Sequence, residues 1–357
     1  MSRKLRVLVA GLVAGEAVQG GAAWAVLQYV LGLRRLGHDV YLVEPLREGG
    51  NTATAYFGAI ISRFGIHGEL TPRGKSLTEF EIVLNISGML DVDAIATIPI
   101  RVYLDLDPAF NQLWHQAGID THFHGHTHFV TVGQAIGRDG CDVPTHGLEW
   151  IGTVPPVVLE EWTRADRVVT PAFTTVGNFR SYGSIDHGGS RYGQKVHSLR
   201  KLVDLPRRVQ ERFLLAMLVH ADDHKDRAAL IEGGWELVDP SLVAGTPDAY
   251  HSFIQGSRAE IAIAKSGYVV SQCGWFSDRS ACYLASGRPV VAQDTGFSRY
   301  LPTGEGLLSF SDEDAAVAAI DDLQGDYARH ARAARRLAEE YLDSDRVLSR
   351  LLQAVGA

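Results

Sequence analysis

Residues 271–297 bring several chemically useful features close together. Their sequence, SQCGWFSDRSACYLASGRPVVAQDTGF, contains a Gly-bearing loop, a short helical stretch, a Gly-x-Pro pair and a Val-Val strand. A loop that leads into a helix presents free backbone N–H groups and the positive end of the helix dipole, which suits a diphosphate. Ser277 and Asp278 stand at the expected helix start, where capping is an equal alternative. The ligand contacts expected in this segment are Trp275, Ser277, Asp278, Asp294, Thr295 and Gly296.

Two other groups of reactive side chains stand in the first half of the chain. Asp105 and Asp107, in YLDLDP, lie on the same side of an expected strand end because side chains alternate along a strand. Either one is also a candidate cap for the helix that follows. The four histidines of HFHGHTHF (residues 122–129) would share one face of an extended strand, a plausible arrangement for metal ligands. No carboxylate cluster completes such a site, so we predict no metal centre.

The elements that must position these residues alternate between strand and helix. Residues 5–11 form a continuous apolar run, typical of a strand buried in a parallel sheet, and a helical pattern then leads to a second strand at 38–45. This βαβ unit predicts a doubly wound α/β domain. A second alternation follows the paired prolines of residues 151–162. Further strands are expected at 80–86, 101–106, 128–132, 167–169, 173–176, 213–219, 235–238, 259–264 and 289–292.

Two sequential Rossmann-like domains would enclose a cleft. In open α/β sheets, ligands bind beyond the carboxyl ends of the strands. Glycines and hydrogen-bonding side chains follow nearly every expected strand, which indicates a ligand site there, although loops are polar in general.

Composition indicates which partners and which cellular compartment to expect for the protein. The formal net charge of -8 over 357 residues argues against a nucleic-acid partner. Three cysteines, Cys141, Cys273 and Cys282, without a CxxC pair predict a reducing compartment, which we take to be the cytoplasm. No apolar run is long enough to cross a bilayer, so we expect no integral membrane segment.

Several motifs in order along the chain resemble one enzyme family. ACYLASGRPVVAQDTGF (residues 281–297) is similar to the donor-site segment EALA-x-G-x-PVVA of GT-B glycosyltransferases, and QCGWFS resembles their HCGWNS. LPTGEGLLSFSDEDAAVAAI resembles the G-x-GLL ending of the same domain. The Gly20-Gly21 pair and LGHDVYLVEP are similar to the GG loop and the GHEV segment of these enzymes.

The resemblance implies two doubly wound Rossmann-like domains of the GT-B type. Residues 1–160 would form an acceptor domain, residues 161–335 a donor domain, and residues 336–357 a helix that packs back on the first domain. The implied activity is metal-independent transfer of a sugar from a nucleotide-diphosphate sugar, a co-substrate rather than a cofactor. Cations would neutralise the diphosphate, since a guanidinium clamps two phosphate oxygens. The remaining implied donor-binding residues are Gly20, Gly21, Asn178, Arg180, Lys195, Glu260 and Lys265.

The first domain would then hold the acceptor, expected to be a small or soluble molecule. The family uses a carboxylate or a histidine to deprotonate the acceptor hydroxyl. The candidates are Asp105, Asp107 and His220, with a satisfied structural histidine as the alternative for His220. The predicted acceptor-binding residues are Asn85, Ser87, His124 and His126.

The sequence departs from the family at one pair of carboxylates. The E-x7-E pair of the retaining branch would fall at Gly274 and Cys282, so Asp278 or Glu260 would have to contact the donor ribose. Alternatives are a sugar-nucleotide 2-epimerase of the same architecture and a degenerate, non-catalytic sugar-nucleotide-binding subunit. A nicotinamide oxidoreductase is disfavoured because GLVAGEAVQGG lacks the GxGxxG spacing. Turnover that requires an acceptor separates the transferase from these alternatives.

Overall fold

The first half of the chain folds around a parallel seven-stranded sheet. The computed structural model describes residues 3–15, 18–45, 51–71 and 75–357. The strand order is β3-β2-β1-β4-β5-β6-β7, with every neighbouring pair parallel. The strands are β1 (Arg6–Ala10), β2 (Asp39–Pro45), β3 (His67–Thr71), β4 (Ile82–Ile86), β5 (Ile100–Asp105), β6 (His128–Thr131) and β7 (Trp150–Gly152), and the helices are α1 (Gly20–Arg35), α2 (Asn51–Phe64), α3 (Val92–Ile95) and α4 (Phe110–Gln116).

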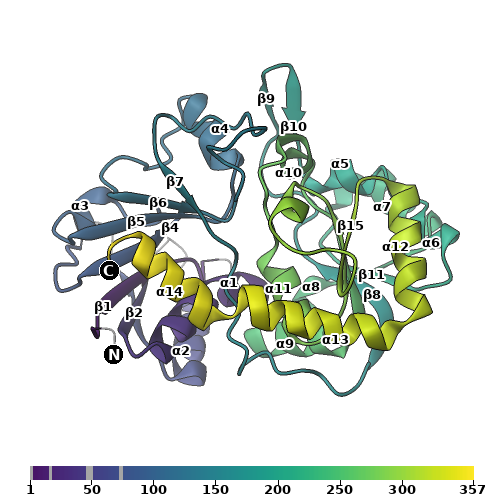
Figure 1. Cartoon of the computed structure of the whole chain (residues 1–357), viewed down its shortest axis with the longest axis horizontal. Coiled ribbons are helices and arrows are strands. Elements are labelled where there is room, and N and C mark those ends of the chain that lie inside the picture. The colour runs from purple at the N-terminus through teal and green to yellow at the C-terminus, as the bar shows by residue number, and fades with distance from the viewer. Residues whose placement is uncertain (1–2, 16–17, 46–50, 72–74) are drawn as a thin grey trace.

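The second half repeats this architecture with six parallel strands in the order β12-β11-β8-β13-β14-β15. The strands are β8 (Thr170–Val176), β11 (Phe213–Ala216), β12 (Trp235–Val238), β13 (Ser257–Ala262), β14 (Val290–Gln293) and β15 (Leu307–Phe310). The helices are α5 (Lys195–Leu199), α6 (Leu205–Arg208), α7 (His224–Glu232), α8 (Pro240–Ala244), α9 (Pro247–Gly256), α10 (Ser266–Ser271), α11 (Asp278–Ala285) and α12 (Glu313–Gly325). An antiparallel hairpin of β9 (Ile185–His187) and β10 (Ser190–Tyr192) projects from this half (Figure 1).

The prediction of two doubly wound α/β sheets is confirmed, but several strand predictions were wrong. Residues 167–176 contain the single strand β8 rather than two strands. The expected crossing at 151–162 begins within β7, and β3, the β9–β10 hairpin and β15 were not predicted. These strands are short, and both hairpin strands are partly exposed, so an apolar pattern marks them weakly.

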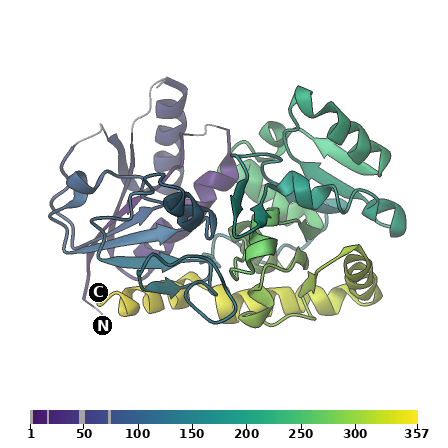
Figure 2. The same ribbon diagram turned by 90° about the horizontal axis from the view of Figure 1, so that it is seen from above.

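The C-terminal helices join the two halves. After α13 (Tyr327–Leu337), a π-helical turn (Ala338–Leu342) ends at Asp343, and α14 (Ser344–Ala354) then runs along the first half (Figures 1 and 2). α14 packs on α1. The Nε of Arg35 donates to the Asp345 carboxylate at 3.1 Å, and Gly32 faces Leu348. None of the described helices is long and apolar enough to cross a membrane.

Helix α1 also approaches the second half very closely. A Cβ built on Gly20 would lie 2.2 Å from the carbonyl oxygen of Thr246, and one on Gly21 would lie 2.8 Å from the Tyr250 ring. The indole of Trp24 donates to the carbonyl of Pro247 at 2.9 Å. The glycine pair, predicted to approach a donor phosphate, therefore permits contact between α1 and α9, and only Gly21 also lines the cavity described below.

Gly20→Ala is expected to lower the free energy of unfolding by about 1–3 kcal/mol, because the added methyl group forces α1 away from the Thr246 backbone. Gly58→Ala in α2 is the matched control, since its Cβ would meet nothing within 4 Å. That control should be stabilised by about 0.5–1 kcal/mol. Urea denaturation of both variants measures the difference, and equal stabilities would contradict the close approach.

Candidate active site

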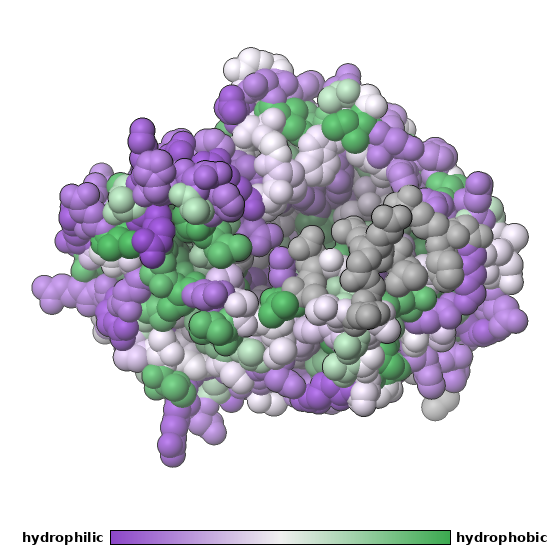
Figure 3. Space-filling model, turned by 180° about the vertical axis from the view of Figure 1, so that it is seen from behind, coloured by the Kyte–Doolittle hydropathy of each residue, from purple (hydrophilic) through white to green (hydrophobic). Residues whose placement is uncertain are grey.

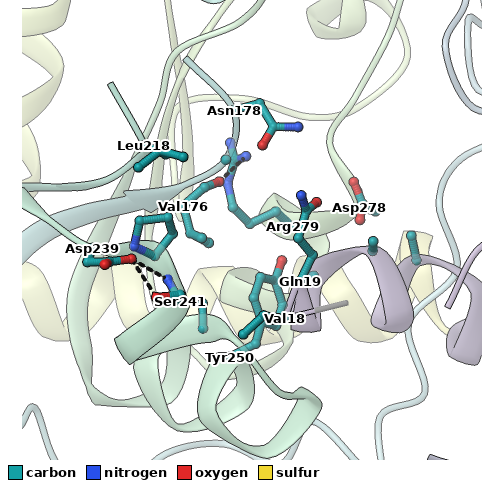
Figure 4. A pocket seen from close by; sticks show the side chains of 16 residues that line it. Val18, Gln19, Val176, Asn178, Leu218, Asp239, Ser241, Tyr250, Asp278 and Arg279 are labelled. Carbon is teal, nitrogen blue, oxygen red and sulfur yellow. Dashed lines mark hydrogen bonds between the residues drawn. The ribbon is translucent and has the colours of Figure 1, made fainter. Parts of the chain in front are cut away.

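A cavity of about 670 Å³ lies between the start of α1 and the carboxyl ends of β8, β11 and β12. The space-filling view of this side is hollowed between the two halves (Figure 3). Gln19 and Gly21 of the first half and Gly177, Asp239 and Asp278 of the second half line it. Figure 4 shows Gln19, Asp239 and Asp278 around the cavity. β8 lies between β11 and β13, so the cavity opens at the point where the strand order reverses, the usual ligand site of such sheets.

Lys195 supplies an unneutralised cation beside this cavity. The residue begins α5 and is only 8% exposed, yet it has no hydrogen-bond or ion-pair partner among the described residues. Burial holds the pKa of its ammonium group well below the ordinary value. A Cβ built on Gly177 would lie 3.0 Å from the Lys195 Nζ and 3.6 Å from the Arg279 Nη1. Two cations therefore converge on a glycine of the cavity wall.

Arg279 is fixed from within the protein. Its Nη1 donates to the carbonyl of Val176 at 2.9 Å, and its Nε donates to Glu260, which is fully buried on β13. Glu260, predicted to bind the donor, is thus the internal partner of Arg279 and does not line the cavity. Because the carboxylate orients the guanidinium, the cation is held in place before any ligand arrives.

The start of α11 completes this part of the cavity. Ser277 is the residue before the helix and makes no side-chain capping bond, and it is buried beside the cavity wall. Asp278 lines the cavity, and burial raises the pKa of its carboxyl group. Backbone N–H groups at a helix start favour an anion, so Lys195, Arg279 and the first turn of α11 act on the same region.

Two predicted residues lie on the surface instead. Arg180 bonds Asp223 at 2.9 Å and Asp226 at 3.5 Å, so its charge is neutralised away from the cavity. His220 is exposed and accepts a hydrogen bond from the Asp222 backbone at the start of a short 3-10 turn. Asn178, predicted to bind the donor, is exposed and lines the cavity.

Trp275 and the Asp294–Thr295–Gly296 turn hold the loop before α11 in position rather than lining the cavity. Asp294 accepts from the backbone of Gly296 at 2.9 Å, and the carbonyl of Thr295 accepts from Gly274 at 2.8 Å. Trp275 stacks on Tyr268 with ring centroids 4.3 Å apart and bridges to Gly133 of the first half. These residues therefore fix the conformation of the loop before α11 and the contact between the two halves.

Asp105, predicted as a base, is fully buried and saturated with donors. Its carboxylate accepts hydrogen bonds from Asn111 at 2.6 Å, from Gln112 at 2.9 Å and from Thr131 at 2.9 Å. These bonds stabilise the turn after β5. Asp107 forms an ion pair with Lys265 of the second half, whose Nζ lies 3.1 Å from the carboxylate. Neither carboxylate is placed to take a proton from a ligand in the cavity.

Burial raises the pKa of Asp105 to about 6. The folded protein therefore retains a proton on Asp105 that the unfolded chain releases near pH 4, so the contribution of Asp105 to stability falls as pH rises from 4 to 6 and is constant above. The expected loss is about 3 kcal/mol. In urea denaturation at several pH values, Asp105→Asn should therefore gain stability relative to the wild type as pH rises from 4 to 6, whereas the difference between Asp39→Asn, at the exposed start of β2, and the wild type should not change with pH. An unchanged slope in the Asp105 variant would contradict the assignment.

The predicted acceptor residues close turns of the first sheet. Asn85 accepts from the Leu90 backbone at 3.0 Å, bonds His126 at 3.1 Å and is fully buried. Burial lowers the pKa of His126 to about 4. His124 is exposed on a loop, and Ser87 has a positive φ of 50° after β4. None of them lines the cavity.

The histidine tract does not form the predicted strand face. Residues 121–127 lie outside strands, His122 has a φ of 59°, and only His128 belongs to β6. Within the described ranges no group of three or more His, Cys, Asp or Glu residues is arranged to hold a metal ion.

Sequence reasoning missed several cavity residues. Arg279 follows Asp278 directly, and its place in the first turn of an expected helix was a usable signal. Tyr250, Gln19 and Leu218 also line the cavity, but no sequence motif marked them. Asp239 accepts from Ser241 at 2.8 Å as the cap of α8 and forms the far rim of the cavity (Figure 4).

Comparisons with known proteins identify the architecture. No protein-family model and no curated protein sequence matches the chain. An alpha-glucosyltransferase solved with UDP and a 13-mer DNA containing an A:G mismatch is 8% identical, with a TM-score of 0.64 over 100% of both chains. The Anabaena protein Alr3699/HepE in complex with UDP and glucose is 11% identical, with a TM-score of 0.62 over 99% of both chains.

These structures also correct one prediction. A second alpha-glucosyltransferase complex, 10% identical with a TM-score of 0.65, likewise contains DNA beside UDP over 100% of both chains. The exclusion of nucleic acid, which was drawn from the net charge of -8, is therefore wrong. Net charge sums over the whole chain and does not describe the field at one cleft. The comparisons establish the fold: the chain has the two-domain GT-B architecture of these UDP-bound structures.

Proposed function

We propose that this protein is a glycosyltransferase that binds a nucleotide-diphosphate sugar in the cavity between its halves. The observation that carries the proposal is the buried, unpartnered ammonium of Lys195 beside Arg279, at the switch point of the second sheet. A buried cation without a partner is costly, and a diphosphate is the ligand that would neutralise it. UDP in similarly folded glycosyltransferases supports this reading.

The proposed chemistry follows from the charges. As the bond between the sugar and the diphosphate breaks, negative charge develops on the leaving phosphate. Lys195, Arg279 and the first turn of α11 would stabilise that charge, because they are oriented before the reaction begins. These fixed charges take the part that a metal ion plays in other phosphate sites, so we propose a metal-independent transfer with no cofactor beyond the sugar nucleotide.

Asp278 is the proposed ribose ligand. The family glutamate would stand at Cys282, whose thiol here accepts from the amide of Gln28 at 3.5 Å and is buried. Helical side chains lean toward the helix N-terminus, so a long glutamate at 282 would cover the surface near residue 278. A short aspartate one turn earlier presents its carboxylate in the same region, on the cavity wall.

Ligand-induced stabilisation tests the donor site. UDP, GDP, ADP and NAD are each added alone, and the melting temperature should rise with one nucleoside diphosphate, by an amount that grows with its concentration. Asp278→Asn should reduce that rise, whereas Asp186→Asn on the exposed hairpin should not. Stabilisation by NAD alone would overturn the proposal.

Turnover then separates the transferase from the alternatives. The matching sugar nucleotide is incubated with a panel of hydroxylated small molecules, polysaccharides and DNA, the last because similar structures hold DNA beside UDP. Release of nucleoside diphosphate only with an acceptor supports transfer. Isomerisation of the donor without any acceptor would identify an epimerase. We place the reaction in the cytoplasm, since Cys141, Cys273 and Cys282 are free thiols, as expected in a reducing compartment.

A further inference from the structure

A partly buried polar cluster joins the two halves. The Nζ of Lys265 lies 3.2 Å and 3.1 Å from the two carboxylate oxygens of Asp107. The hydroxyls of Tyr182 and Tyr268 both donate to the same carboxylate. The ammonium also lies 4.1 Å from the centroid of the Tyr182 ring and 5.1 Å from that of Phe110. The ion pair is shielded, with side chains only 18% and 22% exposed, so water screens it weakly.

The members of this cluster come from separate parts of the chain. Asp107 and Phe110 follow β5 in the first half, whereas Tyr182 precedes the β9–β10 hairpin and Lys265 precedes α10 in the second half. Phe110 packs edge-on against Tyr182 and Tyr268, with centroids 5.0 Å and 5.5 Å apart. Asp107 thus bonds both second-half segments from the first half.

The same two segments hold the backbone immediately before Lys195. Gly193 accepts from the N–H of Gly267 at 2.9 Å, and Gln194 accepts from Ser266 at 3.3 Å. The Gln194 side chain accepts from the N–H of Ser181 at 3.3 Å. A Cβ on Gly193 would lie 2.6 Å from the hydroxyl of Ser266, so the backbone at Gly193 packs closely against the Ser266 side chain.

We propose that Asp107 is a positioning residue for the diphosphate cation: by bonding Lys265, Tyr182 and Tyr268 from the first half, it fixes the segments that place Lys195. The inference rests on the proposed donor site. When the halves separate, residues 181–183 and 265–268 lose their bonds to Asp107 and keep the direct bond between Lys265 and Tyr182, so the start of α5 is held less firmly against Gly177. Docking of the two halves therefore assembles the phosphate site, and an open molecule binds the donor weakly.

A double-mutant cycle with UDP as the probe tests this inference. Isothermal titration compares the wild type, Asp107→Asn, Lys195→Met and the double variant. Asp107→Asn is expected to weaken UDP binding about 5- to 10-fold in the wild type and less than 2-fold in the Lys195→Met protein, because residues that act through one another are not additive. Asp248→Asn is the matched control: it breaks the exposed Arg63–Asp248 pair, which also joins the halves, and should leave UDP affinity unchanged.

The outcomes distinguish failure of the Asp107 inference from failure of the proposed donor site. Equal weakening by Asp107→Asn in both backgrounds would show that Asp107 acts independently of Lys195 and would overturn the inference. UDP affinity unaffected by Lys195→Met would instead overturn the donor site itself. If Asp107→Asn does not fold, Tyr182→Phe takes its place in the cycle, since it removes one hydroxyl donor and keeps the ring; an additive effect of that variant also overturns the inference.

Discussion

Replacing Lys195 with methionine is expected to lower the turnover of the sugar nucleotide by roughly 100- to 1,000-fold, the usual effect of removing one group that stabilises transition-state charge. The same change should make the ligand-free protein more stable, by about 1–3 kcal/mol, because it removes a buried charge that has no partner among the described residues. Methionine keeps the length of the apolar stem, so packing is conserved. Steady-state kinetics and urea denaturation measure the two effects.

Opposite signs for activity and stability are the diagnostic feature of this prediction. A structural lysine would lose both together, and such a result would contradict the donor site. Lys201→Met is the matched control, since Lys201 is exposed two residues after α5 and should change neither quantity measurably. Saturating UDP should also reverse the order of stability, because only the wild type gains from the ligand.

The arrangement of the fold was accessible from the sequence because periodicity marks buried elements. The apolar run of β1, the apolar helix α1 and the strand β2 follow from residue pattern alone, and the same holds for the core of β8 and β11. The β9–β10 hairpin escaped prediction because its three-residue strands are partly exposed and flank the glycine pair Gly188-Gly189. The histidine tract was misread because its alternation occurs in a loop, where a positive φ at His122 breaks the strand geometry.

Individual site residues were harder to predict because partners are distant in sequence. Lys195 and Arg180 are both basic residues after β8, but only the fold shows that Asp223 and Asp226 neutralise Arg180. Asp105 and Asp107 share a strand end, yet one is saturated by its own turn and the other is bonded across the interface. Spacing thus predicted the sheet edge at which the cavity opens, whereas charge pairing decided which side chains are left without an ion-pair partner beside it.

Arg279→Met is expected to lower the free energy of unfolding by about 3–5 kcal/mol, because it leaves the carboxylate of Glu260 buried without its cation. One oxygen of Glu260 already lacks a hydrogen-bond partner among the described residues, so no other group compensates. Urea denaturation of the variant measures the loss.

The partner change separates stability from function at this site. Arg279→Met combined with Glu260→Met replaces the ion pair by apolar side chains of similar length and should restore stability to near or above that of the wild type, as is common when both members of a buried pair are removed. The restored protein should still bind UDP poorly, since the guanidinium beside Gly177 is gone. A double variant that regained both stability and UDP binding would show that Arg279 serves only the core. Loss of binding in a stable protein would instead show that the fold retains a buried ion pair in order to hold one cation at the phosphate site.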